Sequence, residues 1–144
     1  MSRDDSRLAR VIDFYESLSQ ASLTGLGKIY ADDAAFKDPF NEVRGVDAIA
    51  GIFRHMYVQV EAPRFMVKSR MADGDEAFLT WVFRFRMKSS PGKEECIRGA
   101  THLRFDAAGL VAMHRDYWDA AEELYEKLPL LGGFMRWLKR RAAS

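Results

Sequence analysis

The sequence predicts an α+β domain in which a cone-shaped, curved and mostly antiparallel sheet wraps around N-terminal helices, followed by a C-terminal helical tail. Apolar residues recur at helical spacing up to Val60, and from Pro63 onward they alternate with polar residues as in strands. Short polar turns separate the later apolar segments, which is typical of an antiparallel meander. A chain of 144 residues fits one domain with a substantial core, and we see no linker that would divide residues 1–144.

Two helices are expected before the first strand. Residues 4–6 offer candidate caps for the first helix. Its apolar face comprises Leu8, Val11, Ile12, Tyr15 and Leu18. Ser22 is a candidate cap of a second, shorter helix that extends to Tyr30.

A short strand and a third helix follow. Residues 35–37 predict the strand, which ends at Asp38-Pro39 because proline restricts the residue before it and has no amide proton to donate. Residues 41–45 are expected to form a turn. The third helix presents on one face Ile49, Ile52, Phe53, Met56 and Val60.

The rest of the chain predicts strands joined by turns, and then helices. The strands are expected near residues 63–71, 77–88, 95–105 and 110–118, with a loop at residues 89–93. Asp119 and Glu122 fit a capping box that opens a fourth helix. The tail, about residues 129–144, mixes apolar and basic residues. We expect it to fold back over the domain, and the alternative is contact with a membrane surface.

Composition argues against several classes of function. Lys and Arg number 22 against 21 Asp and Glu, and this balance disfavours a dedicated nucleic-acid surface. Cys96 is the single cysteine, so an internal disulfide is impossible and we expect a reducing, cytoplasmic compartment. The sequence lacks the apolar run of a signal peptide or of a membrane span. It also lacks metal-ligand histidine spacing and a glycine-rich phosphate loop, so we expect no metal and no cofactor.

Two carboxylates and one histidine are the candidates for chemistry. Asp38 lies at the end of the first strand, and Asp116 follows His114 by two residues on the last strand, on the same face. Apolar surroundings disfavour a charged carboxylate, which makes it a usable base near neutral pH. We therefore predict Asp38 and Asp116 as catalytic acid–base groups, assisted by His114. The alternatives are a turn-capping Asp38, an ion-paired Asp116 and a hydrogen-bonded core His114.

The strand over residues 77–88 can be read in two registers. One turns Arg84 inward, where it would hold a carboxylate or an anionic substrate group. It leaves on the outer face Leu79, Trp81, Phe83 and Phe85. Such an apolar row should not face water, so this register predicts a homodimer through the sheet. The other register places these apolar side chains in the core and the arginines in solvent.

Several short motifs, in order, resemble those of a known superfamily. They are Tyr30-Ala31-Asp32-Asp33-Ala34, Asp38-Pro39, Gly45, Leu103-Arg104-Phe105-Asp106 with Gly109, and Asp116-Tyr117-Trp118. Over about residues 6–125 the chain resembles the nuclear transport factor 2-like superfamily, which includes steroid delta-isomerases, limonene epoxide hydrolases and SnoaL-like polyketide cyclases. The resemblance implies a cavity between sheet and helices, favours the register with Arg84 inward, and implies a homodimer.

The same resemblance assigns roles to individual positions. Asp38 matches the proton shuttle of steroid isomerases, and Thr101 lies where they carry a protonated aspartic acid. Phe14 occupies the position of their oxyanion-hole tyrosine. Arg115-Asp116-Tyr117 is similar to a motif of the epoxide hydrolases, and Asp116 is the nearest match to the acid–base carboxylate of the cyclases.

These expectations define a site and leave three functions open. With Arg84 and Thr101 as polar contacts, the substrate-binding residues are expected to include Tyr15, Tyr30, Phe53, Tyr57 and Trp118. Aromatic residues at such spacing are also typical of plain core. The first hypothesis is a cofactor-independent isomerase, cyclase or lyase acting on a small apolar carbonyl or hydroxyl compound. The others are a non-catalytic binder of a lipid-like molecule and a structural dimer module.

Overall fold

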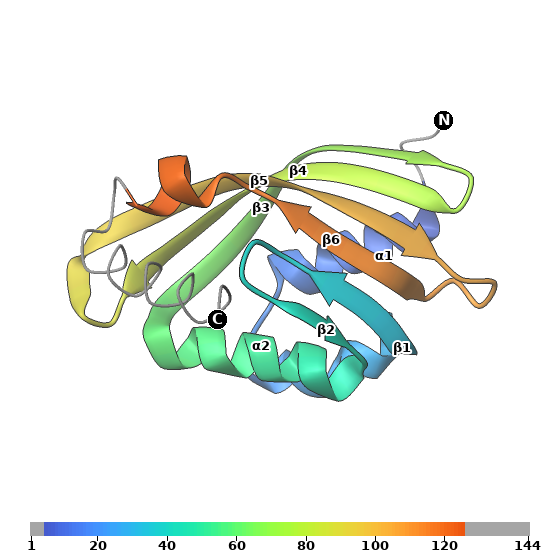
Figure 1. Cartoon of the computed structure of the whole chain (residues 1–144), viewed down its shortest axis with the longest axis horizontal. Helices are drawn as coiled ribbons and strands as arrows, with labels where there is room; N and C mark the ends of the chain where they lie inside the picture. Colours follow the sequence, from blue (N-terminus) through green and yellow to red (C-terminus); the bar gives the residue numbers. More distant parts are fainter. Residues whose placement is uncertain (1–4, 126–144) are drawn as a thin grey trace, which may run out of the picture.

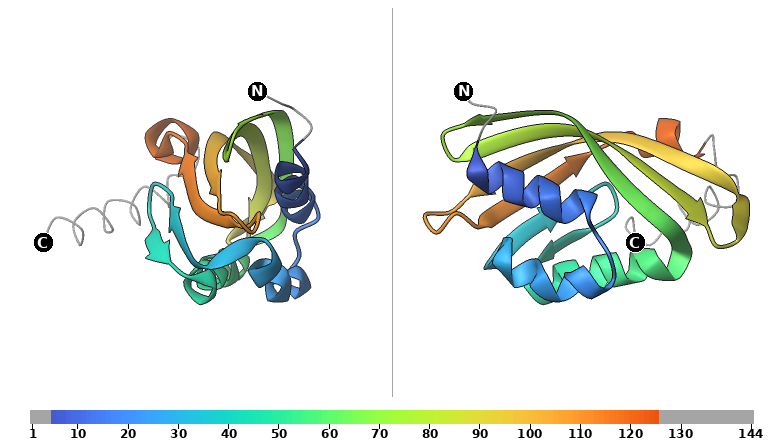
Figure 2. Two further views of the ribbon diagram at one scale, coloured as in Figure 1. Left: turned by 90° about the vertical axis from the view of Figure 1, so that its right-hand side faces the viewer. Right: turned by 180° about the vertical axis from the view of Figure 1, so that it is seen from behind.

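The computed structural model describes residues 5–125, with side chains up to Glu123. Its helices are α1 (Ser6–Glu16), the 3-10 helix η1 (Ala21–Lys28), α2 (Val46–Gln59) and the π-helical turn η2 (Ala121–Tyr125). Its strands are β1 (Tyr30–Lys37), β2 (Glu42–Arg44), β3 (Val60–Asp73), β4 (Glu76–Met87), β5 (Ser90–Phe105) and β6 (Val111–Tyr117). The strands form a six-stranded sheet in the order β2-β1-β6-β5-β4-β3, which arches over α1, η1 and α2 (Figures 1 and 2). The predicted α+β class and curved sheet are confirmed.

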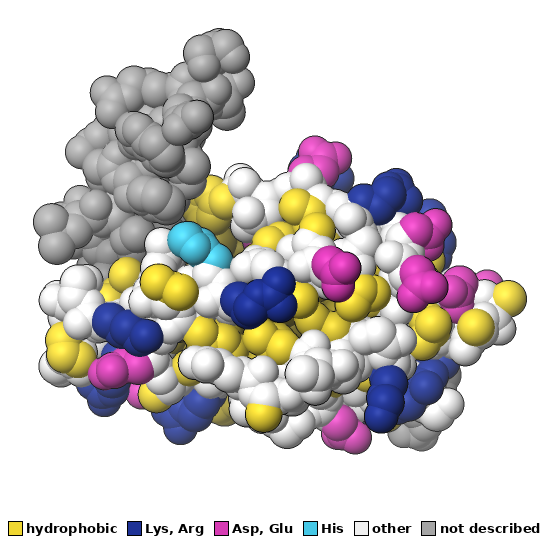
Figure 3. Space-filling view, turned by 90° about the horizontal axis from the view of Figure 1, so that it is seen from below, with side chains coloured by type: hydrophobic (Ala, Val, Ile, Leu, Met, Phe, Trp, Pro, Cys, Tyr) yellow, Lys and Arg dark blue, Asp and Glu magenta, His cyan; other side chains and the backbone are white. Residues whose placement is uncertain are grey.

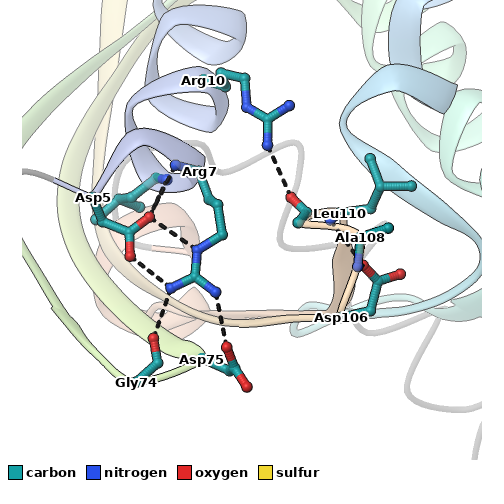
Figure 4. A network of polar contacts seen from close by, with 10 residues as sticks. Asp5, Arg7, Arg10, Gly74, Asp75, Asp106, Ala108 and Leu110 are labelled. Atoms are coloured by element: carbon teal, nitrogen blue, oxygen red, sulfur yellow. Dashed lines mark hydrogen bonds and ion pairs between the residues drawn. The ribbon is translucent and has the colours of Figure 1, made fainter.

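The start of α1 is fixed to the turns at one end of the sheet. The Asp5 carboxylate caps the helix, because it accepts hydrogen bonds from the backbone amides of Arg7 (2.9 Å) and Leu8 (3.3 Å). The Arg7 guanidinium binds Asp5 and also reaches Asp75 (2.8 Å) and the Gly74 carbonyl (2.7 Å) in the β3–β4 turn (Figure 4). The hydrogen bond from Arg7 lowers the pKa of Asp5 to about 2.

The first strand is longer than predicted. Tyr30 was expected at the end of a helix, but it begins β1 and lies beside Val111 of β6. β1 and β6 run parallel, whereas all other neighbouring strands are antiparallel. The predicted turn at residues 41–45 contains the short strand β2, and Gly45 ends it with φ of 102°, a conformation that favours glycine.

The edge strand β3 supplies much of the bend. Pro63 is tolerated there because an edge strand leaves amide positions without a partner strand. Irregular pairing with β4 occurs between Glu61 and Arg64 and again between Val67 and Ser69. Such bulges bend a strand and increase its twist. The sheet therefore curls around the helices and leaves a hollow on its concave side.

The register of β4 corrects one prediction. β4 pairs with β5 so that Leu79 lies opposite Thr101 and Trp81 lies opposite Gly99. Residues directly opposite each other in an antiparallel pair share a face. Because Thr101 faces inward, the apolar row of β4 also faces inward, and Trp81 is only 7% exposed. The register that turned Arg84 inward is therefore wrong, and the alternative register is confirmed.

The outer face of the sheet around β4 is consequently mixed, with Thr80, Arg84 and Arg86 beside Val82 and Phe78, which is 46% exposed. Arg84 lies there and forms an ion pair with Glu94 at 3.4 Å, and Arg64 reaches the same carboxylate at 3.1 Å. The apolar outer row from which we predicted a homodimer is thus absent from the described part of β4. A homodimer through the sheet stays a prediction without that support.

Two further expectations concern other parts of the chain. The helical tail of about residues 129–144 lies outside the described residues. Within residues 5–125, none of the helices has the length and apolar character needed to cross a membrane.

On the side seen in Figure 3, hydrophobic side chains form a band across the middle of the face, with charged side chains interspersed.

Candidate functional site

A cavity of about 550 Å³ lies between the concave face of the sheet and helices α1 and α2. Its volume is in the range of small-molecule sites in proteins. Aromatic side chains form much of its wall, among them Phe36, Phe53, Phe65, Trp81, Phe83 and Phe85. Phe65 stacks on Phe83 with ring centroids 4.4 Å apart. The cavity thus presents flat apolar surfaces to whatever it holds.

A chain of hydrogen bonds runs through the polar side of this cavity. The Tyr15 hydroxyl bonds to the Tyr30 hydroxyl, and the Tyr30 hydroxyl lies 2.8 Å from Nδ1 of His114. On the other side of the ring, Nε2 of His114 lies 2.7 Å from Oδ1 of Asp116. The structure therefore brings the predicted Asp116–His114 pair together. It connects the pair to two tyrosines that the sequence did not link to it.

Asp116 receives a second donor from the sheet. The Thr101 hydroxyl donates to Oδ1 of Asp116 at 2.5 Å and accepts the indole Nε1–H of Trp81 at 2.8 Å. Both His114 and Thr101 thus bind the same carboxylate oxygen. Among the described residues no side chain donates to Oδ2, and the Asp116 side chain is 19% exposed. The second oxygen is the one left for a bound molecule.

Gly99 makes this arrangement sterically possible. It lies opposite Trp81, and a Cβ atom at Gly99 would come within 2.5 Å of the indole ring. The ring can therefore lie against the β5 backbone and direct its N–H to Thr101. We did not identify Gly99 or Trp81 from the sequence as site residues. The feature of the sequence that could have indicated them is the apolar row on β4, which lies opposite a glycine in the neighbouring strand.

Asp38 lies at the end of β1 and serves a turn as well as the cavity. Its Oδ1 accepts hydrogen bonds from the amides of Phe40 (2.8 Å) and Asn41 (2.7 Å), and both of its oxygens lie 3.1 Å from Nδ2 of Asn41. Burial raises the pKa of Asp38; these hydrogen bonds oppose that effect, and the charge of Asp116 adds to it. Asp38 therefore combines the turn-capping alternative with a place in the cavity lining.

The two acids are neighbours because of the sheet register. Lys37 of β1 pairs with Arg115 of β6, so Asp38 and Asp116 follow at the next position of each parallel strand. An outer groove lined by Tyr117 and other residues shares both aspartates with the cavity. The carboxylates therefore stand in the wall between the cavity and the outside.

The other predicted site residues divide into two groups. The cavity lining includes Tyr15, Phe53, Thr101 and Trp118. It does not include Tyr30, which is fully buried behind it, Tyr57, or Arg84 on the outer face. The Tyr57 hydroxyl is buried and has no hydrogen-bond partner among the described residues. Within the described part of the chain, no three His, Cys, Asp or Glu side chains are grouped to hold a metal ion.

Comparisons with known proteins agree with this fold. A similar structure is an NTF2-like protein of unknown function from Burkholderia pseudomallei, at 17% identity and a TM-score of 0.72 over 82% of this chain and 94% of that one. A protein with a ketosteroid isomerase-like fold from Catenulispora acidiphila, solved with trimethylamine, matches at 17% identity and a TM-score of 0.71 over 83% and 90%. An LEH-like epoxide hydrolase from Mycobacterium tuberculosis matches at 18% identity and a TM-score of 0.69 over 90% and 94%. At these identities the likeness concerns the fold.

The sequence itself gives the family. No curated protein matched the chain at a significant level. The family model described as the SnoaL-like domain matches residues 11–114, which span α1 to β6 and include most of the cavity wall. The chain therefore belongs to the SnoaL-like domain family and has the NTF2-like fold.

Proposed function

We propose that this protein is a cofactor-independent enzyme that moves a proton on a small apolar carbonyl or hydroxyl compound, as an isomerase, cyclase or lyase. One observation carries the proposal. Asp116 stands in an aromatic cavity of about 550 Å³ with one oxygen held by two donors and the other without a protein donor among the described residues. A fixed carboxylate within reach of an apolar molecule is the arrangement that general acid–base catalysis requires.

Asp116 acts as the base in this proposal. Its Oδ2 takes a proton from a carbon or hydroxyl next to the carbonyl of the bound molecule, and the electron pair of the broken bond stays on that molecule. His114 and Thr101 hold Oδ1, so Oδ2 is the oxygen that faces the bound molecule when Asp116 takes the proton. Asp116 then returns the proton to another atom, which gives an isomer, or to a departing hydroxyl, which gives elimination.

Asp38 has the supporting role. Both of its oxygens already accept hydrogen bonds from the turn at Phe40 and Asn41, so it is less available to a bound molecule. Its raised pKa means that it holds a proton at higher pH than an exposed aspartate would. Asp38 therefore supports the turn beside Asp116, and Asp116 is the base in this proposal.

Deuterium exchange tests the proposal with a defined probe. 2-Tetralone is a flat bicyclic ketone with acidic α-hydrogens, and its exchange in D₂O can be followed by NMR. We expect the wild type to accelerate exchange and Asp116→Asn to lose about 100-fold or more of that rate, since general acid–base groups contribute about 10²–10⁴-fold. Asp13→Asn, at an exposed site on α1, is the matched control.

The opposite outcome would favour the binder hypothesis. If tetralone binds but exchanges no faster than in buffer, or if Asp116→Asn retains the wild-type rate, carboxylate catalysis on this class of ketone is contradicted. Native mass spectrometry of the purified protein would then be used to detect a retained lipid-like molecule.

We propose the cytoplasm as the compartment of this protein, because it has the single cysteine Cys96.

A further inference from the structure

The hydrogen-bond chain that starts at Asp116 has its other end in the same cavity. Tyr15 and Asp116 both line the cavity, whereas Tyr30 lies behind the wall and is 0% exposed. We propose that Tyr15, Tyr30, His114 and Asp116 form a proton relay, in which Tyr15 and Asp116 exchange protons with two different atoms of one bound molecule. The proposal rests on the proposed function and assigns Tyr15 as a catalytic residue and Tyr30 as a positioning residue.

The chemistry of its members gives the relay a direction. A carboxylate only accepts, so the proton between His114 and Asp116 resides on Nε2. In the neutral ring Nδ1 is then an acceptor, and the Tyr30 hydroxyl donates to it. The Tyr15 hydroxyl in turn donates to the Tyr30 oxygen. The Tyr15 oxygen therefore offers its remaining lone pair to the cavity.

Transfer along the chain balances at every step. A proton that leaves the molecule binds the Tyr15 oxygen, and the electron pair of the broken bond stays on the molecule. The Tyr15 proton moves to Tyr30, the Tyr30 proton moves to Nδ1 of His114, and the Nε2 proton moves to Oδ1 of Asp116. No tyrosinate or imidazolium accumulates, and the charge passes from Asp116 to the molecule. The carboxyl group of Asp116 then turns so that its protonated oxygen faces the cavity, and Asp116 gives this proton to a second atom of the molecule.

The outer groove gives the relay a way to return to its starting protonation. After one transfer the His114 proton is on Nδ1, and the starting arrangement needs it on Nε2. Asp116 also borders the outer groove, where it can take a proton from water and pass it to Nε2. One proton then leaves along Tyr30 and Tyr15 to a water molecule that enters the cavity after the product has left, so the number of protons on the relay is unchanged.

NMR tests the connection without a substrate. The Cζ carbon of a tyrosine labelled with ¹³C reports the hydrogen bonding of its hydroxyl, and Tyr15→Phe assigns the Tyr15 signal among the five tyrosines. We expect Asp116→Asn to shift the Tyr15 signal in the wild-type background and to leave it in place when Tyr30 is Phe. An equal shift in both backgrounds would overturn the relay, because the effect would then pass through space.

Deuterium exchange of 2-tetralone tests the role of the relay in turnover. Tyr30→Phe does not alter the cavity lining, so KM should stay within about twofold while kcat falls by about tenfold or more and the solvent isotope effect decreases. Asp13→Asn, at the exposed site on α1, is again the control and should leave kcat unchanged. If Tyr30→Phe keeps the wild-type kcat while Asp116→Asn is inactive, the relay is wrong and the proposed function stands. If the wild type does not exchange tetralone at all, the proposed function fails for this probe, and the NMR result still decides the connection.

Discussion

Gly99→Ala tests the packing that holds Asp116 in place. The new Cβ would lie 2.5 Å from two atoms of the Trp81 ring, whereas ordinary contacts begin at 3.4 Å. The indole must therefore withdraw by about 0.9 Å, and its 2.8 Å hydrogen bond to Thr101 lengthens or breaks. Thr101 then loses the partner that directs its own proton toward Asp116.

The expected destabilisation follows from two effects. Overpacking a close-packed core costs about 1–3 kcal/mol. Loss of the buried indole hydrogen bond costs about 1 kcal/mol more. The smaller conformational freedom of alanine in the unfolded chain returns about 0.4–1 kcal/mol. We therefore expect the free energy of unfolding of Gly99→Ala to fall by about 1–3.6 kcal/mol.

Guanidinium unfolding measures this change, and the indole N–H signal of Trp81 in a proton–nitrogen NMR spectrum reports the lost hydrogen bond. Gly25→Ala is the control, since nothing lies within 4 Å of a Cβ at that position. If Gly99→Ala unfolds like the wild type and the Trp81 signal does not move, then Trp81 does not pack on Gly99. The inner register of β4 would then be refuted.

Three other perturbations have distinct expected outcomes. Asp38→Asn should be more stable than the wild type at pH 7. Because the folded state raises the pKa of Asp38 above its ordinary 3.8, the wild type loses stability as pH rises above 3.8. A difference in the free energy of unfolding between the two proteins that does not grow with pH would contradict this expectation. Asp5→Asn keeps a helix cap but loses the ion pair with Arg7, so it should cost about 1 kcal/mol or less at neutral pH. That cost should shrink as pH falls from the ordinary pKa of 3.8 and disappear below the folded-state pKa of about 2, as Asp5 becomes protonated. Thermal melts of both proteins between neutral pH and a pH below 2 measure the difference, and a difference that stays constant would contradict this expectation. Trp81→Phe keeps an aromatic wall but removes the donor to Thr101, so it should reduce exchange of 2-tetralone with little change in KM, and an unchanged kcat would show that this bond has no role in turnover.

Local patterns in the sequence were enough to predict many elements of the fold. A cap within residues 4–6 was expected, and Asp5 caps α1 through hydrogen bonds that span two and three residues. The spacing of two between His114 and Asp116 placed both on one face of a strand, and the structure brings their side chains to 2.7 Å. These features depend on near neighbours in the chain, which periodicity describes.

Features that depend on pairing between distant segments were missed. Tyr30 joins β1 because Val111 of β6 lies beside it. The pattern of residues 22–30 alone is equally compatible with Tyr30 at the end of a helix and with Tyr30 at the start of a strand. Both faces of β4 carry large side chains, so its alternation was compatible with either orientation. The pairing of Trp81 with Gly99 decides between them, and register across a sheet is not a local property.

The most direct measurement compares the rate of deuterium exchange into 2-tetralone for the wild type and Asp116→Asn, at saturating ketone and one pH. A carboxylate that moves protons inside the cavity predicts acceleration by the wild type and loss of about 100-fold or more in the variant, with binding retained. Equal rates for the two proteins would mean that Asp116 holds the cavity together without doing chemistry in it.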